Sequence, residues 1–166
     1  MIQDYILPKP STTTGYALHR TTAGLVAGEK VLFRDCGDRV IIRTAAKISE
    51  DAAPVEQPRA GEVRVFQLRA SVSKKTKGKR SYFPVSDWRS RHAWLARQGE
   101  RYGFDLLTVN CAADFATVEK TGRKFTVDRT DFAGALKVTD ADKFALALQN
   151  GVGGTGRAFG FGLLII

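Results

Sequence analysis

The alternation of apolar and polar residues along the first part of the chain predicts three short strands and one helix. Apolar runs bounded by proline or glycine predict strands at residues 2–7, 31–33 and 39–43. The last two flank Asp35–Asp38, which contains a glycine and suits a hairpin turn. Hydroxyl side chains at residues 11–14 can cap a helix, which we expect to run to about Val26.

The second part of the chain predicts more strands and two further helices. Residues 62–72 alternate, with Phe66 and Leu68 on one face, as in a half-buried strand. Asp87 can cap a helix that ends near Gly103, and Asp140 can cap another. Further strands are expected at residues 104–111, 115–119, 124–128, 132–138 and 163–166. Loops are expected at residues 47–60, 73–81 and 151–162, the last rich in glycine.

This order of elements predicts an α+β fold built from tandem ferredoxin-like (RRM-like) units. The second half reads β-α-β-β-α-β, which is the ferredoxin-like order. The first half reads β-α-β-β, the same unit reduced by its second helix. We therefore expect an N-terminal unit at residues 1–60 and a C-terminal unit at residues 61–166, which ends in a C-terminal glycine-rich loop.

Positive charge is concentrated in one segment of the chain. Residues 59–101 hold twelve lysines and arginines against three acidic residues, and so carry the whole net charge of +9. Such a segment favours a polyanionic partner such as nucleic acid, although a solvated charged loop is the plainer alternative. Contacts with phosphates would set affinity and its salt dependence rather than sequence choice. The candidates are Lys74, Lys75, Lys77, Lys79, Arg80, Arg89, Arg91, Arg97 and Arg101.

Several other classes of protein are disfavoured by the sequence. Cys36 and Cys111 form no C-x-x-C pair, so neither a zinc site nor a disulfide framework is indicated. The first ten residues do not resemble a signal peptide, and no apolar run approaches the roughly 18 residues of a membrane span. With only His19 and His92 available, no cluster has the spacing of metal ligands, and we expect no cofactor. These features predict a cytoplasmic protein that does not contact membranes.

Four motifs, taken together, resemble those of one enzyme family. They are Gly151-Val-Gly-Gly-Thr-Gly-Arg-Ala-Phe-Gly-Phe-Gly-Leu-Leu164, Phe66-Gln-Leu-Arg-Ala70, Ala93-Trp-Leu95 and Tyr16-Ala-Leu-His19. In their order along the chain and in their chemistry they resemble the CRISPR repeat-processing endoribonucleases of the CasE type, from the type I-E Cascade complex. The connector at residues 48–64 is short for that family.

The resemblance implies a metal-independent endoribonuclease that cleaves a CRISPR repeat hairpin in precursor RNA. RNA carries its own nucleophile, because a deprotonated 2′-hydroxyl attacks the neighbouring phosphorus and leaves a 2′,3′-cyclic phosphate. His19 suits the proton transfer, as its ordinary pKa of about 6.5 lies near working pH. Tyr16 lies three residues earlier and shares its helical face. Whether His19 acts as base or acid stays open, and the alternative is a surface histidine beside a packing tyrosine.

The resemblance also implies RNA contacts outside the catalytic pair. We expect them at Arg20, Arg69, Arg123, Lys124, Gly153, Gly154, Gly156 and Arg157, beside the basic segment above. Glycines let a phosphate approach backbone amides closely, although the loop also suits a purely structural role. His92 is expected to contact phosphate or solvent. The expected partners are the repeat hairpin, as precursor and as mature guide RNA, and Cascade-type effector subunits.

Two other functions stay open from the sequence. The first is an RNA-hairpin-binding subunit of the same fold that does not cut. The second is an unrelated basic module, for instance ribosomal, that binds RNA or DNA without preferring a hairpin.

Overall fold

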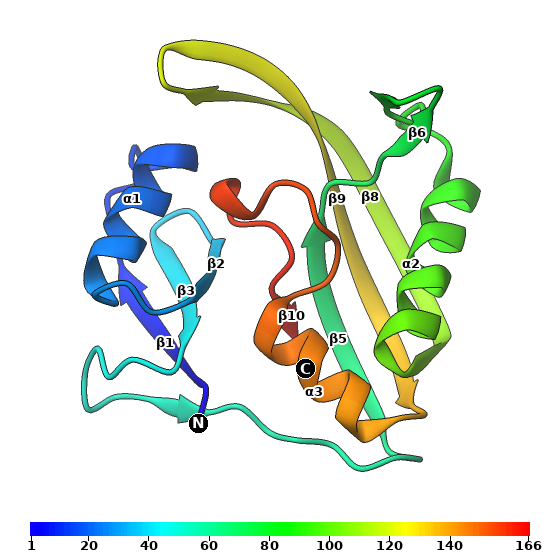
Figure 1. The fold of residues 1–166 in the computed structure, drawn as a ribbon, viewed down its shortest axis with the longest axis horizontal. Helices are drawn as coiled ribbons and strands as arrows, with labels where there is room; N and C mark the ends of the chain where they lie inside the picture. The colour runs from blue at the N-terminus through cyan, green and yellow to red at the C-terminus, as the bar shows by residue number, and fades with distance from the viewer.

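Two four-stranded antiparallel sheets lie beside each other, and the C-terminal loop runs between them (Figure 1). The computed structural model describes residues 1–166. Strands from residues 3–54 build one sheet, and strands from residues 63–70 and 104–165 build the other. No strand is shared between the two sheets, and we propose the predicted division between residues 60 and 61 as the boundary of the units.

The N-terminal sheet has the ferredoxin-like strand order without the second helix. It contains β1 (Gln3–Pro8), β2 (Val31–Asp35), β3 (Arg39–Thr44) and β4 (Ala53–Pro54), arranged β2-β3-β1-β4, and α1 (Gly15–Leu25) follows β1. A loop joins β3 to β4 where a full unit carries a helix. The predicted reduction of this unit is therefore confirmed. Its core is formed by Tyr5, Leu18, Phe33, Val40 and Ile42.

The C-terminal unit has the complete ferredoxin-like order. Its elements are β5 (Val63–Ala70), α2 (Trp88–Tyr102), β8 (Phe104–Lys120), β9 (Arg123–Val138), α3 (Ala141–Asn150) and β10 (Leu164–Ile165), and the sheet order is β10-β5-β9-β8. As predicted, Asp87 and Asp140 cap the two helices by accepting backbone hydrogen bonds from Ser90 and Lys143, each at 3.0 Å. Apolar residues of α2 and α3 pack on this sheet and form the larger core.

The sequence divides β8 and β9 into four strands, whereas the structure has one long hairpin. Residues 112–114, Ala-Ala-Asp, break the apolar alternation, but they pair across the hairpin instead of turning. Asp114 lies opposite Arg129 and forms an ion pair with it at 2.5 Å. Backbone hydrogen bonding does not depend on the hydrophobic pattern, so this stretch of the projecting hairpin stays extended.

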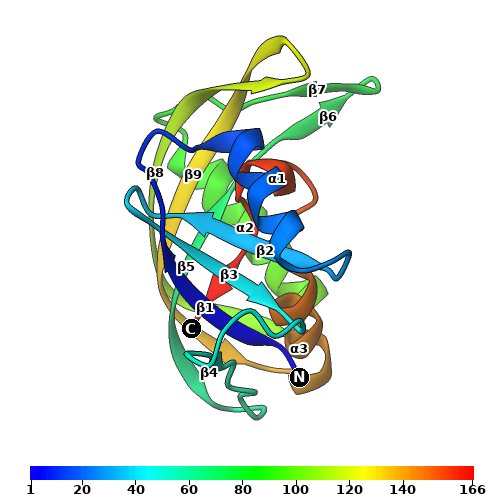
Figure 2. The same ribbon diagram turned by 90° about the vertical axis from the view of Figure 1, so that its left-hand side faces the viewer.

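The predicted loop at residues 73–81 is a second, smaller hairpin. It consists of β6 (Lys74–Thr76) and β7 (Lys79–Ser81), joined by Lys77 and Gly78, both at positive φ, as a two-residue hairpin turn requires. The ribbon is exposed and contains no apolar alternation, which is why the pattern misses it. Both hairpins project toward the same end of the molecule (Figure 2).

A buried ion pair ties α2 to β9 and to both ends of the segment that carries the small hairpin. Arg91 Nη1 lies 2.6 Å from Asp128 Oδ2, and both side chains are fully buried. The Val72 amide donates to Asp128 at 2.9 Å. At the other end of the segment, the Arg91 guanidinium donates to the carbonyls of Phe83 and Pro84 at 3.1 and 3.2 Å. The predicted RNA contact of Arg91 is wrong, because its charge is used inside the protein.

A second buried arginine joins the two units. Arg43 of β3 donates two hydrogen bonds of 2.7 Å to Asp4. Its Nη1 donates to the carbonyl of Leu164 in β10 at 2.7 Å and to that of Leu148 in α3 at 3.4 Å. The N-terminal sheet is therefore fastened to the last strand and the last helix of the C-terminal unit.

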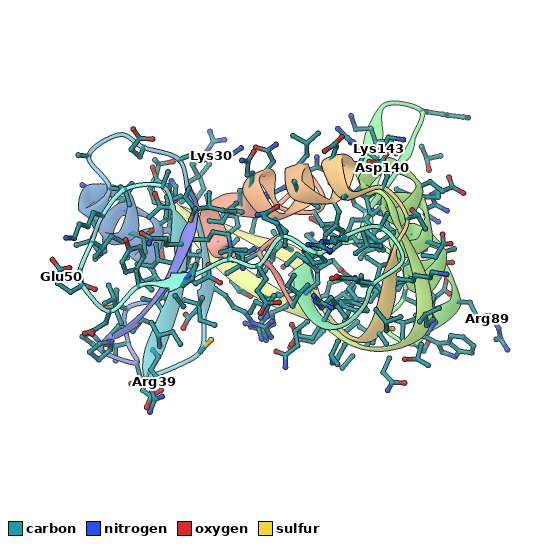
Figure 3. All side chains as sticks on the ribbon, turned by 90° about the horizontal axis from the view of Figure 1, so that it is seen from below. Lys30, Arg39, Glu50, Arg89, Asp140 and Lys143 are labelled. Atoms are coloured by element: carbon teal, nitrogen blue, oxygen red, sulfur yellow. The ribbon has the colours of Figure 1, made fainter.

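None of the three α-helices combines the length and the apolar character that a membrane crossing requires. Figure 3 shows Arg89 at the far end of the C-terminal unit, away from Arg39 and Glu50 of the N-terminal unit.

We expect Asp128→Ala to lower the free energy of unfolding by about 3–5 kcal/mol, because it leaves the Arg91 charge buried and unpaired. Urea denaturation measures this. The matched control is Asp114→Ala, which breaks the exposed pair with Arg129 and should cost no more than about 1 kcal/mol. Equal losses for the two variants would show that burial of the Arg91–Asp128 pair does not increase its contribution to the free energy of unfolding.

Candidate active site and RNA-binding surface

Helix α1 brings Tyr16 and His19 together, as their spacing predicts. Their ring centroids are 5.7 Å apart, and the His19 ring also stacks on Phe33 of β2 at 6.1 Å. Leu18 and Thr22, on the inner face of the helix, are buried and anchor it to the sheet. The pair therefore stands on a rigid element rather than on a loop.

One ring nitrogen of His19 has no partner within the protein. The His19 side chain is half-buried, and its Nδ1 atom is shielded from solvent and makes no hydrogen bond. Thr22 donates instead to the backbone carbonyl of His19 at 3.0 Å. No carboxylate of the protein hydrogen-bonds this imidazole.

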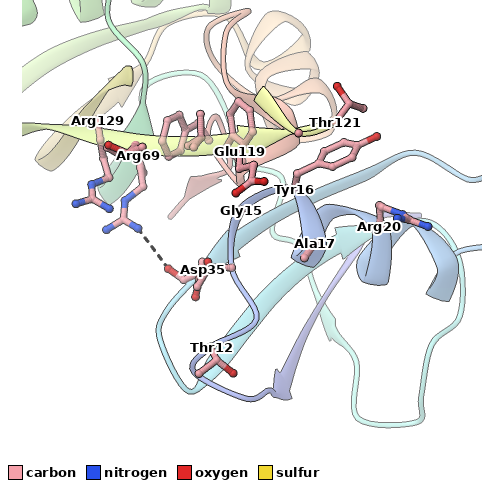
Figure 4. Close-up of a pocket in the computed structure, with 17 residues that line it drawn as sticks. Thr12, Gly15, Tyr16, Ala17, Arg20, Asp35, Arg69, Glu119, Thr121 and Arg129 are labelled. Carbon is pink, nitrogen blue, oxygen red and sulfur yellow. Dashed lines mark hydrogen bonds between the residues drawn. The ribbon is translucent and has the colours of Figure 1, made fainter. Parts of the chain in front are cut away.

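A cavity of about 700 Å³ opens in front of Tyr16. Its walls come from the start of α1, the end of the β8–β9 hairpin and the glycine-rich loop. Tyr16, Arg20 and Thr121 line it, and Figure 4 shows the Tyr16 ring directed toward the hairpin end near Thr121. His19 is not among the lining residues and lies between Tyr16 and Phe33.

The hairpin contributes a lysine to this site that the sequence analysis missed. Lys120 Nζ lies 5.4 Å from the centroid of the Tyr16 ring, in a cation–π arrangement. The two residues are separated by more than a hundred positions, so no local pattern joins them. The only available signal was the position of Lys120 beside the predicted basic hairpin tip at Arg123 and Lys124.

Arginines on the opposite wall of the cavity are already paired with carboxylates. Arg69 contacts Asp131 at 2.7 Å, and this hydrogen bond raises the pKa of Arg69. Arg129 hydrogen-bonds Asp114 and lowers the pKa of that carboxyl. Figure 4 shows Arg69 and Arg129 side by side, with Arg69 also donating to the Asp35 carbonyl at 3.4 Å. These guanidiniums are fixed in place, and their charge is largely balanced.

Arg34 beside them is different and was also missed. Burial lowers its pKa, and repulsion from Arg69 adds to the effect. Its Nη1 atom is buried without a hydrogen-bond partner. In the sequence Arg34 is followed by Asp35. Their opposite charges suggest a local ion pair, and nothing in the sequence indicates that Arg34 is half-buried.

Most of the predicted RNA-binding lysines and arginines are exposed and form no ion pair within the protein. On the small hairpin these are Lys74, Lys75, Lys77, Lys79 and Arg80; the others are Arg20 on α1, Arg89 on α2, and Arg123 and Lys124 at the end of the long hairpin. Arg89 lies over the Trp88 ring at 4.5 Å. Their charge is free to meet an anionic ligand, and their role in RNA binding stays a prediction.

The glycine-rich loop is held by its own arginine. Arg157 donates to the Gly153 carbonyl, and a side chain at Gly151 or Gly162 would collide with its guanidinium. Burial lowers the pKa of Arg157. The arginine therefore supports the loop from inside, and the phosphate contact expected of Arg157 stays a prediction.

The three predicted loop glycines differ in what they require. Gly156 has φ of 85°, and a Cβ there would lie 2.3 Å from the Phe161 ring. Gly153 has φ of 79° and packs against Trp94. Gly154 has neither restriction and is exposed.

Nowhere in the structure do three or more His, Cys, Asp or Glu side chains gather closely enough to hold a metal ion.

Comparison with known proteins places this architecture beside one group. The family model described as CRISPR associated protein matches residues 39–166. A structure of the CRISPR endoribonuclease Cse3 bound to a 19-nucleotide RNA is 24% identical, with a TM-score of 0.82 over 99% of both chains. Cas6e from Escherichia coli K-12 is 21% identical, with a TM-score of 0.78 over 99% of this chain and 98% of that one.

A chain of a CRISPR RNA-guided surveillance complex is also similar. It is 20% identical, with a TM-score of 0.75 over 98% of this chain and 97% of that one. Among curated proteins, none matches the sequence.

We expect Gly156→Ala to lower the free energy of unfolding by about 1–3 kcal/mol, because alanine there needs a strained φ and meets the Phe161 ring. Chemical denaturation measures the loss. Gly154→Ala, two positions earlier in open space, is the matched control and should change stability by less than about 0.5 kcal/mol. A neutral Gly156→Ala would mean that the loop does not need this conformation.

Proposed function

This chain belongs to the CRISPR-associated protein family, and from that premise we propose that it is an endoribonuclease which processes CRISPR repeat transcripts. It cleaves the repeat hairpin in precursor RNA by 2′-hydroxyl attack, without a metal ion, and keeps the mature guide RNA bound. The observation that carries the proposal is the pairing of Tyr16 and His19 on one face of α1, beside a cavity lined by Tyr16 and Arg20, with Lys120 over the Tyr16 ring.

The reaction requires removal of one proton, delivery of another and positive charge on the phosphate, and these side chains can supply all three. The 2′-oxygen bonds to phosphorus as the bond to the 5′-oxygen breaks, so one proton is removed and another is delivered. An imidazole transfers protons well near neutral pH, and the Nδ1 atom of His19, although shielded from solvent, makes no hydrogen bond within the protein. The Tyr16 hydroxyl donates to the phosphate, and Lys120 and Arg20 offset the charge that develops on it.

The nature of the substrate and of these groups supports the proposed metal independence. RNA supplies the nucleophile itself, so no metal-bound water is required to create one. The positive charge on the reacting phosphate comes from lysine and arginine side chains. His19 transfers the protons and Tyr16 binds the phosphate, as the sequence motif implies.

The exposed basic side chains suit a folded RNA rather than a single base sequence. The small hairpin and the tip of the long one present lysines and arginines that have no carboxylate partner, and both project to one end of the molecule (Figure 2). An A-form stem is recognised mainly through its backbone shape, and unpaired nucleotides carry most of the sequence information. We propose that the stem lies along these two hairpins, with its 3′ base at Tyr16.

We also propose that the chain remains on the hairpin as a subunit of a Cascade-type complex. The support is the similarity, over almost its whole length, to a chain of a CRISPR RNA-guided surveillance complex. Retention of the product would limit each protein molecule to a single round of cleavage.

One observation favours a second candidate function. His19 lies behind Tyr16 rather than on the cavity surface. A chain in which this histidine does not reach the RNA would bind the hairpin without cutting it, and the same experiment separates the two functions.

We expect His19→Ala to reduce single-turnover cleavage of a repeat hairpin in EDTA by about 10²–10⁴-fold, because it removes the proton-transfer group. Labelled RNA resolved on a denaturing gel measures the rate, and a filter-binding assay follows affinity. The matched control is His92→Ala, the other half-buried histidine of the chain, which should cleave at close to the original rate. RNA with a 2′-deoxy group before the cut should bind and stay intact.

The outcomes distinguish the two candidates. Cleavage by the unaltered protein that survives His19→Ala would exclude the proposed catalytic role of this residue. Tight binding of the hairpin with no cleavage at all would make the chain a hairpin-binding subunit. Equal affinity for hairpin and unrelated nucleic acids would favour a general basic module.

We expect the double variant Lys75→Ala, Lys79→Ala to reduce the dependence of RNA affinity on salt. If each lysine neutralises one phosphate, the slope of log affinity against log salt should fall by about 1.4–1.8. Equilibrium binding at several salt concentrations measures it. Lys143→Ala, at an exposed lysine that faces Asp140 on α3 (Figure 3), is the control and should leave the slope unchanged.

A further inference from the structure

A second cavity, of about 340 Å³, adjoins the first and shares Phe159 with it. Three segments that are distant in the sequence form its walls: the residues around the end of β7, the β8–β9 hairpin and the glycine-rich loop. Its volume is near the lower end of the range for small-molecule sites, roughly 300–1,000 Å³. It therefore suits one compact flat group rather than an extended chain.

Aromatic rings supply much of its apolar wall. Phe125 and Phe159 meet edge to face with centroids 5.6 Å apart, and Tyr82 lines the cavity from the third segment. Phe125 remains 41% exposed although it follows the basic turn of the long hairpin. A phenylalanine left in solvent among lysines and arginines loses the benefit of burial, which a stacked ligand would restore.

Polar groups of two kinds lie around these rings. Arg80 and Lys120 line the cavity, and neither forms an ion pair within the protein. The backbone amides of Gly154, Thr155 and Gly156 donate to no other group of the chain. The cavity therefore combines flat apolar walls, free hydrogen-bond donors and positive charge.

We propose that this cavity binds one unpaired nucleobase of the RNA, and this inference rests on the proposed function for the identity of the ligand. A base has a π-face that can stack on Phe125 and an edge with acceptors for free amides, and its phosphates suit Arg80 and Lys120. Lys120 also lies over the Tyr16 ring, so the cavity is continuous with the candidate active site. The captured nucleotide is therefore one that flanks the cleaved phosphodiester, outside the stem.

Capture of this base would give the enzyme a means of alignment. In-line attack requires the backbone on either side of the reacting phosphate to be held in one geometry. A base stacked on the exposed face of Phe125 holds one side, while the stem bound to the basic hairpins holds the other. The cavity thus positions the substrate and takes no part in bond breaking.

The test is a double-mutant cycle between the protein and the RNA. The repeat hairpin carries a 2′-deoxy group that blocks cleavage, and each unpaired nucleotide next to the stem is replaced in turn by an abasic one. We expect Phe125→Leu to weaken binding of the intact hairpin about tenfold. For the RNA that is abasic at the captured position, the same variant should change affinity by less than about twofold. The control variant is Trp88→Leu, which removes an aromatic side chain that is 49% exposed and lies outside this cavity.

A second measurement does not depend on the stability of the variant. Replacing the captured base with 2-aminopurine should give fluorescence that is quenched on binding to the unaltered protein, because stacking quenches this base. Loss of affinity that is the same for intact RNA and for every abasic RNA, together with no quenching at any position, would overturn the inference. The same result for Trp88→Leu as for Phe125→Leu would also overturn it.

The two proposals fail in different ways. Cleavage of the hairpin without any position-specific coupling leaves the proposed function intact and refutes the base-binding cavity. Coupling at one nucleotide without any cleavage supports the cavity and refutes the nuclease. If the protein does not bind the hairpin, the cavity has no RNA ligand and both proposals fail.

Discussion

The buried contact between Arg91 and Asp128 is the constraint on which the position of the small basic hairpin depends. Asp128 accepts from the Val72 amide and from Arg91, while the same guanidinium donates to the carbonyls of Phe83 and Pro84. Both ends of the segment that carries the small basic hairpin are thus fixed to one charge pair on α2 and β9. A flexible lysine-rich ribbon would disperse its charge over many positions, and this attachment confines it to one side of the long hairpin.

The candidate active site likewise depends on contacts between elements that are distant in the sequence. Helix α1 holds Tyr16 and His19 by helical spacing, and Phe33 fixes the imidazole from the sheet below. The long hairpin then reaches the N-terminal unit and places Lys120 over Tyr16. The cavity beside Tyr16 exists only because β8 and β9 continue well beyond the sheet that supports them, since their outer ends form one of its walls (Figure 1).

Much of this could be predicted from the sequence, and the rest could not for identifiable reasons. Local patterns gave both ferredoxin-like units, the helix caps at Asp87 and Asp140, and the pairing of Tyr16 with His19. The local patterns failed where the partner that determines a residue's role is distant in the sequence. Arg91 reads as one more basic residue among Arg89 and Arg97, and only Asp128, thirty-seven positions later, makes it internal. The small residues and the aspartate at 112–114 indicated a strand break because the strand that pairs with them is distant in the sequence. Lys120 and Arg34 were missed for the same reason.

The junction made by Arg43 has a consequence for how the two units can change over time. On the side of the C-terminal unit its acceptors are main-chain carbonyls, at Leu148 and Leu164. Every residue type offers a carbonyl, so those two positions can exchange side chains without losing the connection, provided the strand and helix keep their paths. The chemical requirement falls wholly on Arg43 and Asp4, within the smaller unit. The side chains at Leu148 and Leu164 are therefore free to change without loss of this contact between the units, and on the side of the larger unit the contact requires no particular residue type.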